Sequence, residues 1–273
     1  MKQLKQMKPT QNSIIAALSQ LKSSFGKMKE KFILSWVYDA VFYALIVLLF
    51  TQLLSLLTNQ LAAVEPLMQQ AAGSAELAEQ AVSVMSKLIW TAGASVVLIP
   101  LLLLALYSLF KGLIWHNIAG TRFGWKPFWK FFLLNLIWYV VSLPVFSAWL
   151  MLVFYLATLF GLKWIAWILL VLSIIVWLHL LATMHYSFAH NQKIGKSLGD
   201  IFKVGFAKIN KFIARYAVAV AALLAWSQLW RIVAGFKMTV EVQLILFGVV
   251  IAAPFFGWLR IYIAEGLKTV FKN

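Results

Sequence analysis

Long apolar runs with few charges recur six times along the chain. They cover residues 32–58, 88–110, 131–160, 164–189, 212–235 and 242–266. Each run is long enough to cross a bilayer, which takes about 20 residues of helix. The runs are rich in Leu, Ile, Val and Phe and lack the alternating polarity of barrel strands. The pattern predicts an all-α polytopic integral membrane protein whose six transmembrane helices pair as three hairpins.

The composition excludes an ordinary soluble domain. The chain is 63% apolar and only 12% charged, with a mean hydropathy of +0.88. Soluble domains carry about 25% charged residues. We therefore interpret residues 32–266 as one membrane domain.

The basic residues lie almost entirely on one side of the six runs. Of the 24 lysines and arginines, the exceptions are Lys87, Lys163, Arg231 and Lys237. Cytoplasmic loops carry such an excess, so both termini are predicted to be cytoplasmic, in a prokaryotic plasma membrane. The cytoplasmic parts would then be residues 1–31, 111–130, 190–211 and 267–273. The connection 59–87 would lie outside.

The outside connection 59–87 is rich in Ala, Gln and Glu, which tolerate or favour helix. We expect it to extend the first two spans as a helical hairpin that turns near residues 72–74. A protein partner could dock there, although self-packing of the hairpin is the simpler interpretation.

The N-terminal segment 1–31 is predicted to form an amphipathic helix on the membrane surface. Its apolar positions Ile14, Leu18, Leu21, Phe25, Met28 and Phe32 follow alternating steps of four and three. That spacing places them in one stripe, with lysines off it. Such a helix lies among anionic lipid headgroups.

A similar stripe is expected in residues 197–212, formed by Leu198, Ile201, Phe202, Gly205, Ile209 and Phe212. Docking of this segment onto the cytoplasmic ends of the spans is the alternative to lipid contact. The lysines expected to face lipid are Lys22, Lys27, Lys29, Lys31, Lys126, Lys130, Lys203, Lys208 and Lys211. Related basic and aromatic segments, 25–32, 123–131 and 205–212, precede the odd-numbered runs and indicate a threefold repeat. Convergence at the interface would produce the same pattern.

Several ionisable or polar residues fall within the apolar runs. An ionisable group in hydrocarbon costs about 2.5–3.5 kcal/mol and needs a partner or a function. The candidates are Asp39, His179, His185, Arg215, Arg260 and Glu265, with the amides Asn135, Gln52 and Gln228. Asp39 and Arg260 lie at equal depth, about two turns from the cytoplasmic side, so they could form an ion pair. A lone arginine could instead extend to the interface.

No motif for catalysis, a metal or a cofactor is present in the sequence. The chain has no cysteine, and no two of its four histidines stand at i,i+4. A phosphate-binding loop, a dinucleotide fingerprint and a serine-nucleophile elbow are also missing. We expect no enzyme activity, no cofactor and no metal site. Membrane topology and anionic lipid account for the net charge of +16, so we expect no nucleic-acid binding.

Two functions remain compatible with this pattern. The first is a non-enzymatic membrane scaffold or accessory subunit that acts through lipid and partner contacts. The alternative is a small proton- or solute-coupled transporter. The residues that a transporter would use are Asp39, His179, Arg260 and the midplane prolines Pro100, Pro144 and Pro254. A polar cavity reaching the midplane would favour transport, and a closed apolar core would favour the scaffold.

Overall fold

The computed structural model describes residue 19 and residues 28–70, 75–235 and 239–272. Every element in these residues is helical, and six helices are long and apolar enough to cross a membrane. The predicted all-helical class is therefore confirmed for these residues, as are six helices with the length and apolarity of membrane spans. Four residues of the N-terminal stripe, Ile14, Leu18, Leu21 and Phe25, lie outside the described residues, as do Lys22, Lys27 and the side chains of Met28 and Lys29. Phe32, at the end of the stripe, is half-buried.

The long helices follow one another along the described chain. Their bounds are α2 (Met28–Gln70), α3 (Ala75–Ala119), α4 (Trp125–Leu159), α5 (Lys163–Asn191), α7 (Ile213–Ala234) and α9 (Ala253–Lys272). Two short elements precede α9: α8 (Val240–Leu246) and the π-helix η4 (Phe247–Ala252). Between α5 and α7 lie α6 (Ile194–Asp200), the π-helix η2 (Ile201–Phe206) and the 3₁₀-helix η3 (Ile209–Phe212).

The helices extend beyond the predicted apolar runs. The predicted connection 111–130 is mostly helical, because α3 continues to Ala119 and α4 begins at Trp125. Gly120 and Gly161, with φ angles of 72° and 68°, end α3 and α4. In both turns the glycine N–H and the next N–H bond back to the last helical carbonyls, as in a Schellman motif. Glycine suits these positions because side chains disfavour positive φ.

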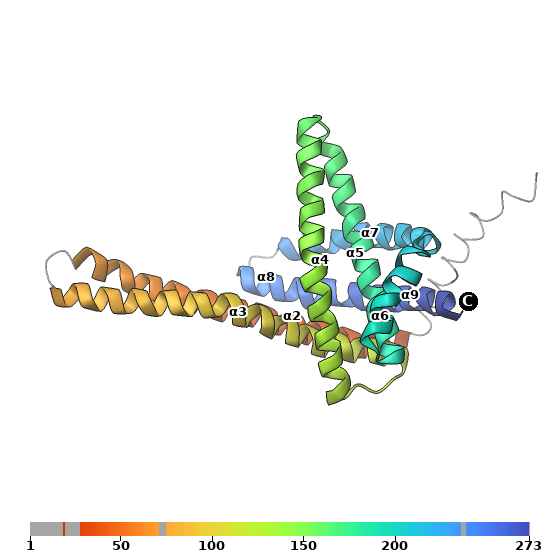
Figure 1. The fold of residues 1–273 in the computed structure, drawn as a ribbon, viewed down its shortest axis with the longest axis horizontal. Coiled ribbons are helices and arrows are strands. Elements are labelled where there is room, and N and C mark those ends of the chain that lie inside the picture. The colour runs from red at the N-terminus through yellow and green to blue at the C-terminus, as the bar shows by residue number, and fades with distance from the viewer. Residues whose placement is uncertain (1–18, 20–27, 71–74, 236–238, 273) are drawn as a thin grey trace, which may run out of the picture.

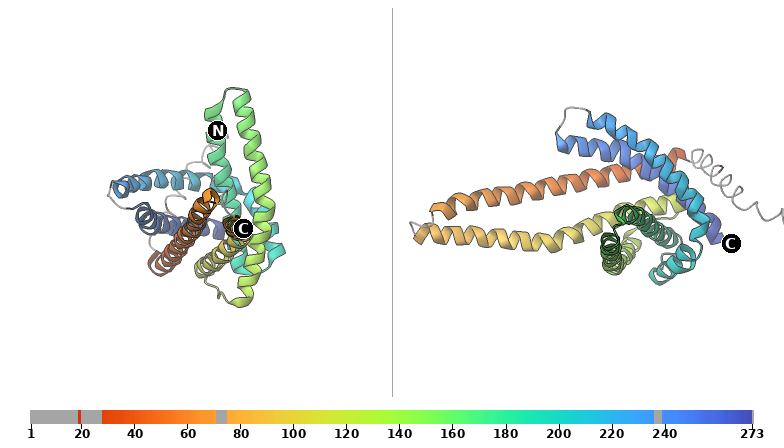
Figure 2. Two further views of the ribbon diagram at one scale, coloured as in Figure 1. Left: turned by 90° about the vertical axis from the view of Figure 1, so that its left-hand side faces the viewer. Right: turned by 90° about the horizontal axis from the view of Figure 1, so that it is seen from above.

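The helices diverge from one region. Figure 1 shows α2 and α3 side by side as a long arm, with α4 and α5 running across it. Figure 2 shows α7 next to the α8–α9 helix. The main core lies where these arms meet, and we call this region the hub. Its fully buried members include Phe131, Met184, Phe188, Phe212 and Leu267.

Away from the hub the arms expose apolar side chains. Val96 on α3 and Met151 on α4 are each 74% exposed, and Trp90 is 76% exposed. Contiguous apolar surface of this extent is rare on monomeric soluble proteins. It is the surface expected of helices that face lipid.

The sequence predicts one helix with a single apolar stripe for residues 197–212, and the structure differs. This segment is divided among α6, η2 and η3, and the wider π turn changes the residue spacing. Ile201 and Phe212 point into the core, whereas Phe202 is 66% exposed and stacks on Phe206. The apolar residues therefore lie on two faces, one docked on the protein and one exposed.

Candidate functional site

A carboxylate shared by two cations lies in the hub. Asp39 of α2 is 5% exposed, and its Oδ1 lies 2.5 Å from Nζ of Lys111 in α3. Its Oδ2 accepts a hydrogen bond from Nη1 of Arg260 in α9. The Asp39–Arg260 pair that equal depth suggested is present. Lys111 was missed because it follows the second apolar run by one residue and was assigned to the connection.

This ion cluster joins three helices at one point. The ammonium of Lys111 lies 5.1 Å from the ring centroid of Phe42 and 5.9 Å from that of Tyr107. Such distances permit a cation–π attraction, which adds to the ion pair. One negative charge facing two positive charges leaves the cluster with a formal charge of +1. Among the described residues, no second carboxylate lies within ion-pair distance of either cation.

A second polar chain crosses from α5 through α4 to α3. His185 Nε2 lies 2.7 Å from Asn135 Oδ1, and Asn135 Nδ2 donates to Ser108 Oγ at 3.1 Å. Because the amide oxygen can only accept, His185 must be protonated at Nε2. All three side chains are buried. The predicted candidates Asn135 and His185 thus bind one another, and Ser108 completes the chain.

His179 of α5 makes a third contact, with different helices. Its Nε2 lies 3.2 Å from the carbonyl oxygen of Gly205 in η2, so that nitrogen carries the proton. Its Nδ1 is then free to accept from the Tyr216 hydroxyl of α7, 2.7 Å away. A neutral ring satisfies both bonds. Among the described residues, no hydrogen bond or ion pair joins His179 to Asp39 or Arg260.

Two tryptophan indoles donate hydrogen bonds to backbone carbonyls of the second π-helix, η4. Trp36 of α2 donates its indole N–H to Val249 at 2.8 Å, and Trp226 of α7 donates to Ile251 at 2.6 Å. Pro254, the second residue of α9, has no N–H to bond to the carbonyl of Val250. These indoles tie α2 and α7 to the last span.

Two further candidates, Arg215 and Glu265, do not take part in the ion pairs of Asp39. Arg215 donates from Nη1 to the Lys211 carbonyl at 2.8 Å, and its guanidinium lies 5.1 Å from the Phe212 ring centroid. Glu265 is half-buried. Gln52 and Gln228, the other two amides within the apolar runs, are exposed at the protein surface.

Two of the predicted lipid-facing lysines bind helix ends. Lys31 donates to the Ile118 carbonyl at 3.0 Å, and Lys208 donates to the Val270 carbonyl at 3.3 Å. Both carbonyls belong to last helical turns, where a cation is favourable. The other described members of the set are exposed: Lys126, Lys130, Lys203 and Lys211.

A polar pocket that sequence reasoning missed lies at the end of α5. It has a volume of about 360 Å³. In it, Ser187 Oγ donates to Asp200 Oδ2 at 2.5 Å and accepts from Asn191 Nδ2 at 2.8 Å. Asp200 follows the fourth apolar run, residues 164–189, by eleven positions, so hydropathy gave no signal for it.

The polar groups of the hub are arranged for holding helices together. Within the described part of the chain, no three His, Cys, Asp or Glu side chains are placed to hold a metal ion. No protein-family profile, curated protein or solved structure matches the chain. The site must therefore be interpreted from its own geometry.

Proposed function

We propose that the chain is a six-span membrane protein, arranged as three hairpins, that acts as a non-enzymatic scaffold or accessory subunit through lipid and partner contacts. In this proposal both termini are cytoplasmic in a prokaryotic plasma membrane. The observation that carries it is the use of Asp39, Lys111 and Arg260 as a junction between three spans. Charges bound in this way stabilise an arrangement of helices and are poorly placed to move with a substrate.

The lipid half of the proposal rests on aromatic and basic side chains near the hub. Trp125 is 73% exposed and Trp129 is 50% exposed, next to the exposed Lys126 and Lys130. Tryptophan and lysine together favour the headgroup level of a bilayer. The exposed and stacked Phe202 and Phe206 flank Lys203 in the same manner. These patches would hold the cytoplasmic side of the protein against anionic lipid.

The partner half of the proposal rests on the α2–α3 arm. The arm contains the described residues 59–70 and 75–87 and packs internally through Val64 and Ala81, which are buried. Outside that seam it exposes Val82 and Trp90. An accessory subunit would present such a face to another membrane protein.

The proposal is tested by combining native electrophoresis with a flux assay. In mild detergent, the protein from its native membrane should migrate as a complex larger than the purified chain. A Val82→Glu change on the arm should reduce the complex, whereas Leu159→Glu at the tip of α4 serves as an exposed control. Purified protein in liposomes should carry no proton flux under a pH gradient. Flux that disappears in a folded Asp39→Asn variant would contradict the scaffold.

Transport remains the second proposal, and one observation favours it: Asp39, Lys111 and Arg260 are ionisable and lie within the spans. Against it, His179 binds Tyr216 and Gly205 instead of this cluster. The cavity beside Pro100 has almost wholly apolar walls. The flux assay separates the two functions directly.

A further inference from the structure

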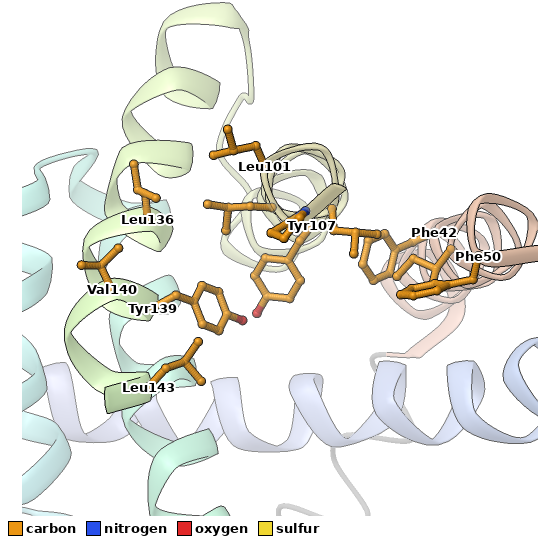
Figure 3. A pocket seen from close by; sticks show the side chains of 12 residues that line it. Phe42, Phe50, Leu101, Tyr107, Leu136, Tyr139, Val140 and Leu143 are labelled. Carbon is orange, nitrogen blue, oxygen red and sulfur yellow. The ribbon is translucent and has the colours of Figure 1, made fainter. Parts of the chain in front are cut away.

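An apolar cleft lies between α2, α3 and α4. Its volume is about 460 Å³, within the range of about 300–1,000 Å³ typical of small-molecule sites. Figure 3 shows Phe42 and Phe50 on one wall and Leu136, Val140 and Leu143 on the other. The only polar atoms that these labelled side chains bring to the cleft are the hydroxyls of Tyr107 and Tyr139, which point toward one another.

The ion cluster lies at one end of this cleft. Phe42 and Tyr107 line the cleft, and the Lys111 ammonium lies over both of their rings. Along α3, Lys111 is one turn from Tyr107, and Pro100 lies about two turns the other way. The apolar wall therefore runs about 10 Å along α3 from Tyr107, whose ring lies near the Lys111 ammonium, to Pro100.

Among the side chains that the structure describes, the ion pairs of the cluster leave one positive charge unbalanced. Asp39 supplies one negative charge against Lys111 and Arg260, whose side chains are 12% and 16% exposed. A net positive charge in hydrocarbon is costly unless an anion approaches it. Both cations thus retain some exposed surface, and the Lys111 ammonium lies beside the cleft, over the rings of Phe42 and Tyr107.

We infer that the cleft binds an anionic phospholipid of the surrounding bilayer. Its phosphate would lie near Lys111 and Arg260, and one acyl chain would lie between Phe50, Pro100 and Val140. Charge complementarity selects the anionic headgroup, and the apolar walls select the chain. This inference deepens the lipid half of the proposed function and rests on the membrane arrangement proposed there.

Purified full-length protein should be titrated in detergent with dioleoylphosphatidylglycerol or dioleoylphosphatidylcholine, and bound lipid counted by native mass spectrometry. One phosphatidylglycerol should bind at least about fivefold more tightly than phosphatidylcholine, because one nearby cation contributes about 1 kcal/mol. Lys111→Gln should remove this preference. Lys87→Gln, which changes an exposed lysine on the arm, should leave it intact.

A second pair of variants tests the cleft itself without disturbing the hub. Val140→Trp would fill the cleft from an exposed position, and Val141→Trp would add the same ring beside it, outside the cleft. The first should weaken phosphatidylglycerol binding at least about fivefold, and the second should not. If Lys111→Gln fails to fold, this pair still decides the question.

Three results would overturn the inference. Equal binding of both phospholipids would leave only nonspecific lipid around the helices. Equal effects of Val140→Trp and Val141→Trp would place the bound lipid elsewhere. Displacement of phosphatidylglycerol by a lower concentration of oleate would identify a free fatty acid as the ligand. The scaffold function is tested separately. If the native complex persists and liposomes show no proton flux, any of these three results would overturn the lipid site and leave the scaffold proposal intact.

Discussion

The ring of Tyr43 in α2 lies directly against Gly248 in η4. A Cβ atom at position 248 would lie 1.8 Å from ring carbon Cδ1 of Tyr43. The first and last spans approach this closely because glycine has no side chain there. The contact lies on the same two helical segments that the Trp36–Val249 hydrogen bond joins.

We predict that Gly248→Ala destabilises the protein. The added methyl must displace the Tyr43 ring, and overpacking of this kind costs about 1–3 kcal/mol. Gly93→Ala in α3 is the matched control, since a Cβ there meets nothing within 4 Å. Unfolding in detergent, followed by circular dichroism, should show a lower free energy of unfolding only for Gly248→Ala. Equal stability of the two variants would refute the close contact.

A mutant cycle at the ion cluster should show three coupled residues. Asp39→Asn leaves two cations without their carboxylate and should cost about 3 kcal/mol in free energy of unfolding. Adding Arg260→Gln should recover part of that loss, and adding Lys111→Gln as well should recover more. Strictly additive losses in detergent unfolding would mean that the three side chains do not interact.

Removal of either indole donor should weaken the last span. Trp36→Phe and Trp226→Phe each leave a carbonyl of η4 without its donor, at a cost of about 1 kcal/mol. Trp164→Phe is the control, because that side chain is 63% exposed. Thermal unfolding in detergent measures all three. If Trp164→Phe lowered the stability as much as the other two changes, the loss would come from general aromatic packing and not from these hydrogen bonds.

Reporter fusions should place positions 73 and 273 on opposite sides of the membrane. The expectation comes from the lysine and arginine asymmetry, which puts the tail in the cytoplasm and residues 59–87 outside. An alkaline phosphatase fusion should be active only at position 73, and a green fluorescent protein fusion should fluoresce only at position 273. The six-span topology would be excluded by both reporters giving the same side.

A peptide of residues 10–31 should bind anionic vesicles as a helix. In water it should be unstructured, because its apolar stripe has nothing to cover it. Replacing Leu18 and Phe25 by Glu should abolish binding, whereas replacing Lys22, Lys27 and Lys29 by Gln should remove only the preference for anionic lipid. Circular dichroism with neutral and anionic vesicles tests both. Equal binding to neutral and anionic vesicles would show that electrostatic attraction does not contribute to binding.

Part of the ion cluster could be inferred from the sequence, because a charged side chain within a membrane span has a high energetic cost and therefore needs a partner. Asp39 and Arg260 stood out as charges within apolar runs, and their equal depth suggested a pair. Lys111 did not stand out, since it directly follows an apolar run, where lysines are common. The partners of His179 were equally hidden, because a backbone carbonyl and a tyrosine carry no distinctive signal.

The sequence by itself determined the six spanning helices, because the length and apolarity of each run depend only on neighbouring residues. The structure alone decided the helix ends and the contacts at the hub. Asp39 and Arg260 are 221 positions apart, and Trp36 and Val249 are 213 apart. Depth can align such residues along the membrane normal, but their lateral proximity arises only when helices pack. Close packing at Gly248 and the wide turns of η2 and η4 then determine which donors meet which acceptors.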